Sequence, residues 1–428
     1  MENDLPKKFS RPVSIFFISL LNLLERFSYY SIKGVIILYA ISEQGWNLER
    51  ESALNYFKWF LVLVGTLPIL TGFLSDFYLK QKKGILIGSV FTLSGSLLLA
   101  VNAFSLNITG LFLMAIGTAF IRPNLWVILG RLYEKSEHQR ILGFLFVIFF
   151  INLGGFFGPY IIGIMRDNEW TWSYIFATIS ITSILFIGIF LLIRNKLEFR
   201  EKNLKVIRYE VYKNDSVLDS EMTGIRRNIN SFLLIAIMLI VSTVFWQYDG
   251  AIMNYHTDFL LNNEDLLLFG FENSDYTFQL IWIITFFTIG AILFIIWYIR
   301  KTGNTIWKIT TAMGFLGISA VLASSLAFIP DHNLPTYFVS SAIIIALADM
   351  FISPMITCYI TRLSDIRYSS TILGFSITIP YFLDWGVNYF QERNEIDIIA
   401  SGPIVIFSVL AMLIIFKKTL EKLANGIV

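Results

Sequence analysis

The long apolar stretches of this sequence contain a few ionisable side chains, and their signs differ between the two halves of the chain. The first half carries basic residues and the second half acidic ones, namely Arg26, Lys33, Lys58 and Arg122, followed by Asp249, Asp349 and Asp384. Because a charge at the centre of a membrane costs at least about 2.5 kcal/mol, each is a candidate for function. Opposite charges on the two halves of the chain can form and break ion pairs around a cavity between them. Such ion pairs suit a protein that has two states of similar energy.

Position along the apolar stretches separates the strong candidates from the weak ones. Lys58 opens its stretch and Asp384 lies near the end of its own, so snorkelling and simple hydration explain these two better. Those explanations are weaker for the three charges near the centres of their stretches, which are Arg26, Arg122 and Asp349. Glu25 is the acid that lies deep in a first-half stretch, and a carboxylate whose pKa moves between two states can couple protons to another process.

The composition requires a membrane protein. Of the 428 residues, 56% are hydrophobic and only 15% are charged, and the mean hydropathy is +0.66. A water-soluble fold could not bury this much apolar surface, because single cores stop growing at roughly 250–300 residues. These values exclude a soluble enzyme, a secreted disulfide-rich domain, a coiled coil and a disordered regulator. One cysteine and three separated histidines offer no metal cluster, so no cofactor is expected other than protons as a coupling ion.

Hydropathy predicts an all-α membrane protein with twelve transmembrane helices, since the apolar residues suffice for roughly twelve spans of about 20 residues. The runs are far too long for barrel strands, and only helices and closed barrels satisfy every backbone group in lipid. The predicted spans are 13–41, 53–79, 84–103, 108–130, 141–165, 171–193, 231–256, 276–299, 305–329, 335–360, 370–390 and 399–416.

The distribution of Lys and Arg predicts the orientation. With a cytoplasmic N-terminus, 26 of the 33 basic residues lie in cytoplasmic segments and only Arg50, Arg166 and Arg393 lie outside. This bias follows the positive-inside rule, so we expect a multi-pass protein of the inner cell membrane with both termini in the cytoplasm. The net charge of +2 gives no reason to expect a nucleic-acid partner.

A polar stretch at 194–230 divides the predicted spans six and six. We therefore predict an N-terminal six-helix bundle at 1–193, a cytoplasmic linker at 194–230 and a C-terminal six-helix bundle at 231–428. Two such bundles joined by a linker are the arrangement of the Major Facilitator Superfamily fold.

The first span, which reads LNLLERFSYYSIKGVIILYA, resembles the E-x-x-E-R-F-x-Y-Y signature of the proton-dependent oligopeptide transporter family within this superfamily. The matching positions are Glu25, Arg26, Phe27, Tyr29 and Tyr30. Asn22 stands where the family has its first glutamate, and Lys33 falls where the family has a basic residue.

Other segments resemble the family in the same order along the chain. GTLPILTGFLSDFYLKQKK is similar to the superfamily's Gly/Asp/basic loop, although Lys80 replaces its second glycine. GTAFIRPNLWVILG, FFINLGGFFGP, VFWQYDG and ADMFISPMITCYITRL resemble family segments of spans 4, 5, 7 and 10. These segments contribute Arg122, Asn152, Trp246, Asp249, Asp349 and Ser353.

The resemblance implies roles for these residues. Proton coupling falls to Glu25 and Arg26, together with the acids Asp249 and Asp349. Two gates between the bundles are also implied, which are an outer pair of Lys33 with Asp249 and an inner pair of Arg122 with Asp349. The implied substrate-binding residues are Tyr29, Tyr30, Lys33, Arg122, Asn152, Trp246, Asp349 and Ser353.

The chemistry of a short peptide agrees with this set. A zwitterion needs a cation for its carboxylate, an acid for its ammonium and aromatic walls for its side chains. Arg26, Lys33 and Arg122 supply cations, and either Asp349 or Asp249 supplies the acid. For Asn152 two readings stay open, because the glycines beside it are equally explained by close helix packing.

The sequence therefore predicts a proton-coupled symporter of di- or tripeptides that works by alternating access, a non-enzyme, and a monomer in the lipid bilayer. One alternative is a facilitator of another small solute, such as an amino acid, a peptide-like metabolite or an anion, with altered or absent proton coupling, since Asn22 removes a titratable site. The other is a transport-inactive receptor or assembly protein on the same fold.

Overall fold

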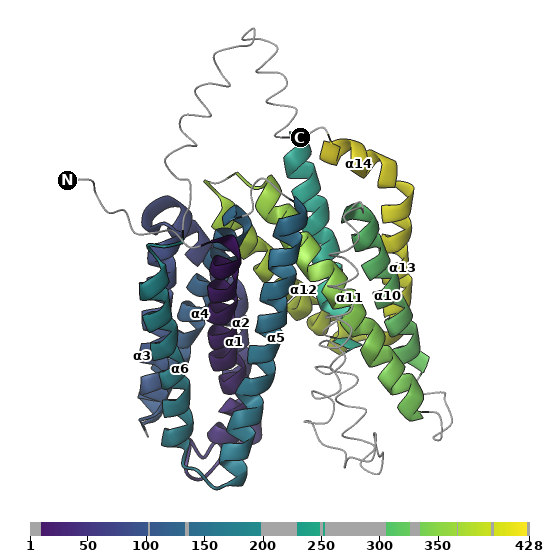
Figure 1. Cartoon of the computed structure of the whole chain (residues 1–428). Coiled ribbons are helices and arrows are strands. Elements are labelled where there is room, and N and C mark those ends of the chain that lie inside the picture. The colour runs from purple at the N-terminus through teal and green to yellow at the C-terminus, as the bar shows by residue number, and fades with distance from the viewer. Residues whose placement is uncertain are drawn as a thin grey trace, which may run out of the picture.

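A computed structural model of the chain describes residues 10–101, 103–132, 137–197, 229–248, 251–252, 305–325, 334–365, 367–394 and 398–425. All regular structure in these ranges is helical (Figure 1). Of the twelve predicted spans, eleven overlap a described helix, and the span at 276–299 lies outside the described residues.

The N-terminal helices form one packed group. They are α1 (Arg11–Ile41), α2 (Arg50–Leu74) with its π-helical continuation η1 (Ser75–Leu79), α3 (Gln81–Leu99), α4 (Phe104–Leu132), α5 (Glu137–Asp167) and α6 (Trp172–Ile193). α1 packs against α5 and α6, and α3 packs against α4 and α6. A β-carbon at Gly88 or Gly95 would lie within 2.7 Å of a carbonyl oxygen of α4, so α3 and α4 approach at backbone distance.

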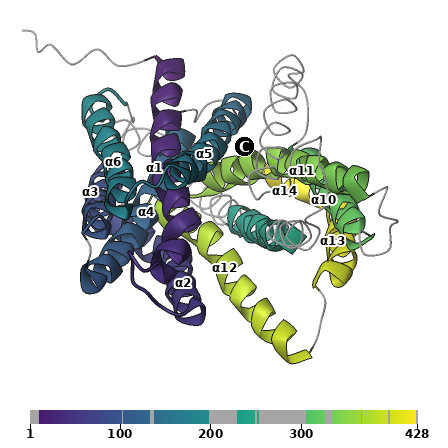
Figure 2. The same cartoon turned by 90° about the horizontal axis from the view of Figure 1, so that it is seen from below.

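The C-terminal helices are a span over Ile229–Tyr248, α10 (Thr305–Ser325), α11 (Leu334–Leu363), α12 (Ser369–Asn394), α13 (Ile398–Ile415) and α14 (Lys417–Asn425). α10 packs against α11 and α13. α12 departs from this group and runs beside α2, as Figure 2 shows. Most of the predicted linker lies outside the described residues, so the domain boundaries remain a prediction.

Eight helices of the described ranges are long and apolar enough to cross a membrane, or nine if the bent pair Gly402–Ile415 and Lys417–Leu423 counts as one span. α1 is not among them, because Asn22, Glu25 and Arg26 lower its hydropathy. The chain is thus a multi-pass membrane protein, and its first helix carries polar and charged side chains where a membrane helix usually has apolar ones.

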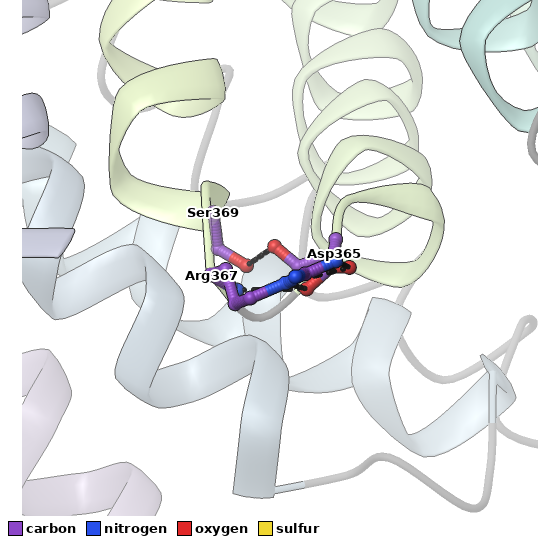
Figure 3. A network of polar contacts seen from close by, with 3 residues as sticks. All are labelled: Asp365, Arg367 and Ser369. Carbon is purple, nitrogen blue, oxygen red and sulfur yellow. Dashed lines mark hydrogen bonds and ion pairs between the residues drawn. The ribbon is translucent and has the colours of Figure 1, made fainter. Parts of the chain in front are cut away.

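The turn that leads from α11 into α12 is fixed by local polar contacts (Figure 3). The Arg367 guanidinium donates to the Asp365 carboxylate at 2.8 Å, and the Ser369 hydroxyl donates to the Asp365 carbonyl at 2.9 Å. The hydrogen bonds to Asp365 raise the pKa of Arg367. Because the pair is exposed, its contribution to stability is small, about 0–1 kcal/mol.

The first turn of α12 is held by Asp76 of η1. The Asp76 carboxylate accepts hydrogen bonds from the backbone N–H groups of Ser370 at 3.2 Å and Thr371 at 2.7 Å. These N–H groups begin a helix and have no partner within it, so the carboxylate both caps them and complements the helix dipole. Asp76 thereby joins the N-terminal group of helices to α12.

Asn124 of α4 extends the same junction. Its amide donates to the Ser75 hydroxyl at 2.7 Å, and its carbonyl oxygen accepts from the Ser370 hydroxyl at 3.0 Å. At this end of the molecule, where α12 begins, polar side chains therefore tie η1 and α4 to α12.

Candidate functional site

Glu25 and Arg26 form an ion pair inside α1. Arg26 donates through Nε to one Glu25 oxygen at 2.5 Å and through Nη2 to the other at 2.6 Å. Both residues are only 4% exposed. A guanidinium that binds both oxygens of one carboxylate satisfies two buried charges at once, which a lysine in its place could not do with the same geometry.

Aromatic rings continue the site along α1. The Arg26 Cζ lies 4.7 Å from the centre of the Tyr29 ring and 5.9 Å from that of Tyr30. The Lys33 Nζ lies 5.9 Å from the same Tyr30 ring. The predicted residues of this helix are therefore gathered on one polar and aromatic face, with Lys33 exposed at its far end.

Glycines of α5 bring α1 into position. A β-carbon at Gly158 would lie 2.7 Å from the Phe27 carbonyl oxygen, and one at Gly154 would strike the carbonyl of Leu23. Asn152 is half-buried and donates to the Ile148 carbonyl of its own helix at 3.2 Å. These contacts favour helix packing as the role of the glycines, while the predicted ligand role of Asn152 stays a prediction.

Arg122 of α4 carries a second guanidinium near the first, and its side chain is half-buried. Glu25, Arg26, Tyr30 and Tyr381 all lie within its electrostatic range. Its Cζ lies 4.9 Å from the centre of the Trp126 ring, and its buried Nε has no hydrogen-bond partner among the described residues. Arg26 binds both oxygens of Glu25, and Arg122 forms no ion pair among the described residues, which leaves excess positive charge and an unused donor at the Arg122 Nε.

Tyr381 of α12 is a site residue that the sequence did not reveal. Its ring packs on Gly65 of α2, where any β-carbon would collide with it, and its side chain contacts that of Tyr29. It brings α12 to the charged cluster on α1 and α4. The neighbouring Pro380 in span 11 was the available signal, since a proline inside a membrane helix often marks a functional segment.

Asp349 of α11 is buried and only 7% exposed, and it accepts a hydrogen bond from the Ser353 hydroxyl one turn away. Among the described residues, the ion pairs are Glu25 with Arg26 and Asp365 with Arg367. Arg122 and Asp349 are therefore not paired in this structure, and the inner gate remains a prediction.

The two remaining predicted residues are Trp246 and Asp249. Trp246 is 37% exposed and packs edge-on against Phe245, with ring centres 5.5 Å apart. Asp249 lies outside the described residues, and so does the outer gate that it would form with Lys33. Within the described ranges, no three His, Cys, Asp or Glu side chains lie close enough together to hold a metal ion.

The chain matches the family model of the Major Facilitator Superfamily over residues 15–382. It is 30% identical over 170 residues to the peptide transporter YePEPT of Yersinia enterocolitica, an alignment that covers 38% of this chain and 33% of that protein. The aligned segments span 29% to 40% of the lengths of the first curated relatives.

Solved structures share the fold over nearly the whole chain. A transporter of the POT family in complex with a thioalcohol-conjugated peptide superposes with a TM-score of 0.69 at 17% identity, over 95% of this chain and 96% of that one. A POT family transporter in complex with 5-aminolevulinic acid gives 0.67 at 17% identity, with the same coverage. The chain therefore belongs to the Major Facilitator Superfamily.

Proposed function

We propose that the protein is a proton-coupled symporter of di- and tripeptides that works by alternating access. The observation that supports this most directly is the charge imbalance at this cluster, where Arg26 binds both oxygens of Glu25 and Arg122 lies nearby without an ion pair among the described residues. A peptide carboxylate bound at Arg122 would balance that charge and accept from its unused Nε.

The other end of a bound peptide would meet an acid. Asp349 on α11 accepts from Ser353 and lies on a helix that contacts both α4 and α5. A peptide ammonium would find its counter-charge there, and the rings of Tyr29, Tyr30 and Tyr381 would flank the backbone between the two ends. In this proposal Trp246 and Asn152 contribute at the edge of the same site.

Proton coupling at α1 would depend on Glu25. Asn22 cannot titrate, and its amide donates to the Ile18 carbonyl at 2.8 Å. Loss of the family's first glutamate therefore leaves Glu25 as the acid of this segment. The gates proposed for the transport cycle are Arg122 with Asp349 on the inner side and Lys33 with Asp249 on the outer side. The protein would act as a monomer in the inner membrane, with both termini in the cytoplasm.

The test is uptake of labelled dialanine into proteoliposomes that contain the purified chain. Uptake should rise when the outside is acidic, and Arg122→Gln should lower it at least about tenfold, because the peptide carboxylate loses a charged donor. Arg367→Gln, which removes an exposed guanidinium, serves as the matched control and should leave uptake unchanged. If a panel of short peptides gives no gradient-stimulated uptake, the symport proposal is rejected.

A second candidate substrate class is a small amino acid-like metabolite. A cation and an acid in one site suit any small zwitterion, and a related transporter has been solved with 5-aminolevulinic acid. Thermal stabilisation by each compound of a metabolite panel separates the two classes: stabilisation by amino acids but not by peptides favours the second.

A further inference from the structure

The helices α13 and α14 meet at a bend near the end of the chain. α14 turns by 62° from α13, as Figure 1 shows. Its sequence, KKTLEKLAN, places leucines on one side and lysines on the other. Leu420 is buried and Leu423 packs against the hydrophobic core, and the helix contacts α10 and α13. The apolar side of α14 is therefore used within the protein, and the lysine side faces outward.

The exposed surface changes from apolar to basic at this bend. The exposed side chains at the end of α13 and in the residue after it are Met412, Ile414, Ile415 and Phe416. Those of α14 are Lys418, Thr419 and Lys422. In a chain that crosses a membrane, exposed apolar side chains face lipid, and lysine ammonium groups reach the headgroups or water. The boundary between hydrocarbon and headgroups therefore falls near the bend.

A tryptophan of α10 lies at the same level. Trp307, in the first turn of that helix, is 55% exposed, and the Lys417 Nζ lies 5.0 Å from the centre of its ring. Tryptophan is enriched where hydrocarbon meets headgroups, because its ring is apolar and its N–H is polar. The contact between these two residues also holds the start of α14 against α10.

The first turn of α14 carries positive charge at a position where a helix tolerates it poorly. Lys417 and Lys418 lie there without an acidic residue, at the positive end of the helix dipole. Lys422 follows Lys418 by one turn on the same side of the helix. The acid of this helix, Glu421, is half-buried, whereas Lys418 and Lys422 are exposed. An anion beside these two lysines would offset both their mutual repulsion and the unfavourable dipole.

We propose that the outward side of α14 binds the phosphate groups of anionic phospholipids, through Lys418 and Lys422. The contact of Trp307 with Lys417 positions the helix at the level of the headgroups. A phospholipid suits this surface better than a free anion, because the exposed apolar side chains that end at Phe416 place acyl chains directly beside the lysines. The predicted orientation of the chain assigns this surface to the cytoplasmic leaflet. The inference is independent of the proposed transport function.

The experiment measures which lipid lies beside α14 in the reconstituted full-length chain. A bimane fluorophore is attached at Thr419→Cys, and Cys358→Ser removes the native thiol, which is buried. The chain is placed in phosphatidylcholine vesicles with a small share of either phosphatidylglycerol or phosphatidylcholine that carries a nitroxide quencher on the acyl chain close to the headgroup. The quenching by each lipid gives the ratio of their affinities for the surface of α14.

This ratio should favour phosphatidylglycerol by roughly 25-fold, because each lysine near an anionic surface contributes roughly a factor of five. It should fall roughly fivefold in Lys422→Gln and to near one when Lys418→Gln is added. Both lysines are exposed, so neither substitution disturbs the buried side of α14. A ratio near one in the chain with both lysines, or a ratio that both substitutions leave unchanged, would overturn the inference.

Arg50→Gln is the matched control. Arg50 is exposed at the start of α2 between Glu49 and Glu51, so its loss changes the net charge by the same amount without touching α14. The affinity ratio at α14 should be the same in this variant. A further arm adds inorganic phosphate. If phosphate displaces phosphatidylglycerol more than sodium chloride of equal ionic strength does, the surface takes a free anion and the lipid assignment is wrong.

Discussion

Arg26 and Arg122 carry the same charge, but among the described residues only Arg26 of the two is paired with a carboxylate. Arg26 is paired through two hydrogen bonds with the residue that precedes it, so its charge is balanced within one turn of α1. Arg122 reaches no carboxylate of its own and keeps a buried Nε without a partner among the described residues. Because a partly buried charge without a counter-charge is unfavourable, an anionic ligand at Arg122 would be stabilised there.

Lys80 has a backbone conformation that favours glycine. It adopts φ 65° and ψ 155°, at the position where the resemblance to the superfamily's loop calls for glycine. Such a conformation costs a residue with a β-carbon about 1–3 kcal/mol. Replacement by glycine would recover only part of this cost, because glycine loses more conformational freedom on folding.

We predict that Lys80→Gly stabilises the protein by roughly 1 kcal/mol, visible as a higher thermal unfolding temperature in detergent. Lys83→Gly is the control, because it removes the same charge within α3, where glycine is expected to cost about 0.5–1 kcal/mol. An equal or lower unfolding temperature for Lys80→Gly would show that no strain is stored there.

At the scale of elements, α2 and α12 meet because each has a glycine where they cross. A β-carbon at Gly374 would collide with the Pro68 carbonyl, and one at Gly72 would collide with the Ser370 carbonyl. This approach places Asp76 at the first turn of α12 and Tyr381 near Arg122. The two glycines therefore position groups from both sets of helices.

Gly374→Ala is expected to force α2 and α12 apart. The overpacking should lower stability by about 1–3 kcal/mol and reduce uptake, because the contacts of Asp76 and Tyr381 lengthen. Gly188→Ala on α6 is the matched control, since a β-carbon there meets nothing within 4 Å. Thermal unfolding and uptake of the two variants are compared, and equal behaviour would rule out a role for the close approach.

At the scale of the whole molecule, the two sets of helices are tied together at the end where α12 begins, through Asp76 and Asn124. Arg122 and Asp349 are nevertheless unpaired in this structure. Arg122 and Asp349 belong to different sets of helices and form no ion pair with each other. This arrangement suits a protein in which a bound ligand and the gate pair compete for the same two charges.

Exchange of the inner gate charges tests this arrangement. Arg122→Asp and Asp349→Arg should each lower uptake at least about tenfold, because each leaves two like charges. The double exchange should recover part of the lost uptake if the residues pair during the cycle. If uptake by the double variant is no higher than the product of the two single-variant effects predicts, the result would argue against the pair. Exchange of the exposed pair Asp365 and Arg367 provides the control.

The sequence by itself determined that the chain spans the membrane many times and which polar residues lie inside it. Hydropathy located eleven spans that overlap described helices, and charges such as Arg26 and Asp349 stood out because lipid tolerates so few. The sequence also named Glu25 and Arg26 as candidates, but their ion pair was found only in the structure, because consecutive residues on a helix do not face each other.

Only the tertiary structure decided which helices meet. A helix that is apolar on nearly every face gives little indication of the neighbour that each face contacts. For this reason Tyr381 was not found from the sequence, and the glycines beside Asn152 could be assigned to packing only from their contacts. Membrane helices associate through close packing and scattered hydrogen bonds, and these depend on shape in three dimensions rather than on hydropathy along the chain.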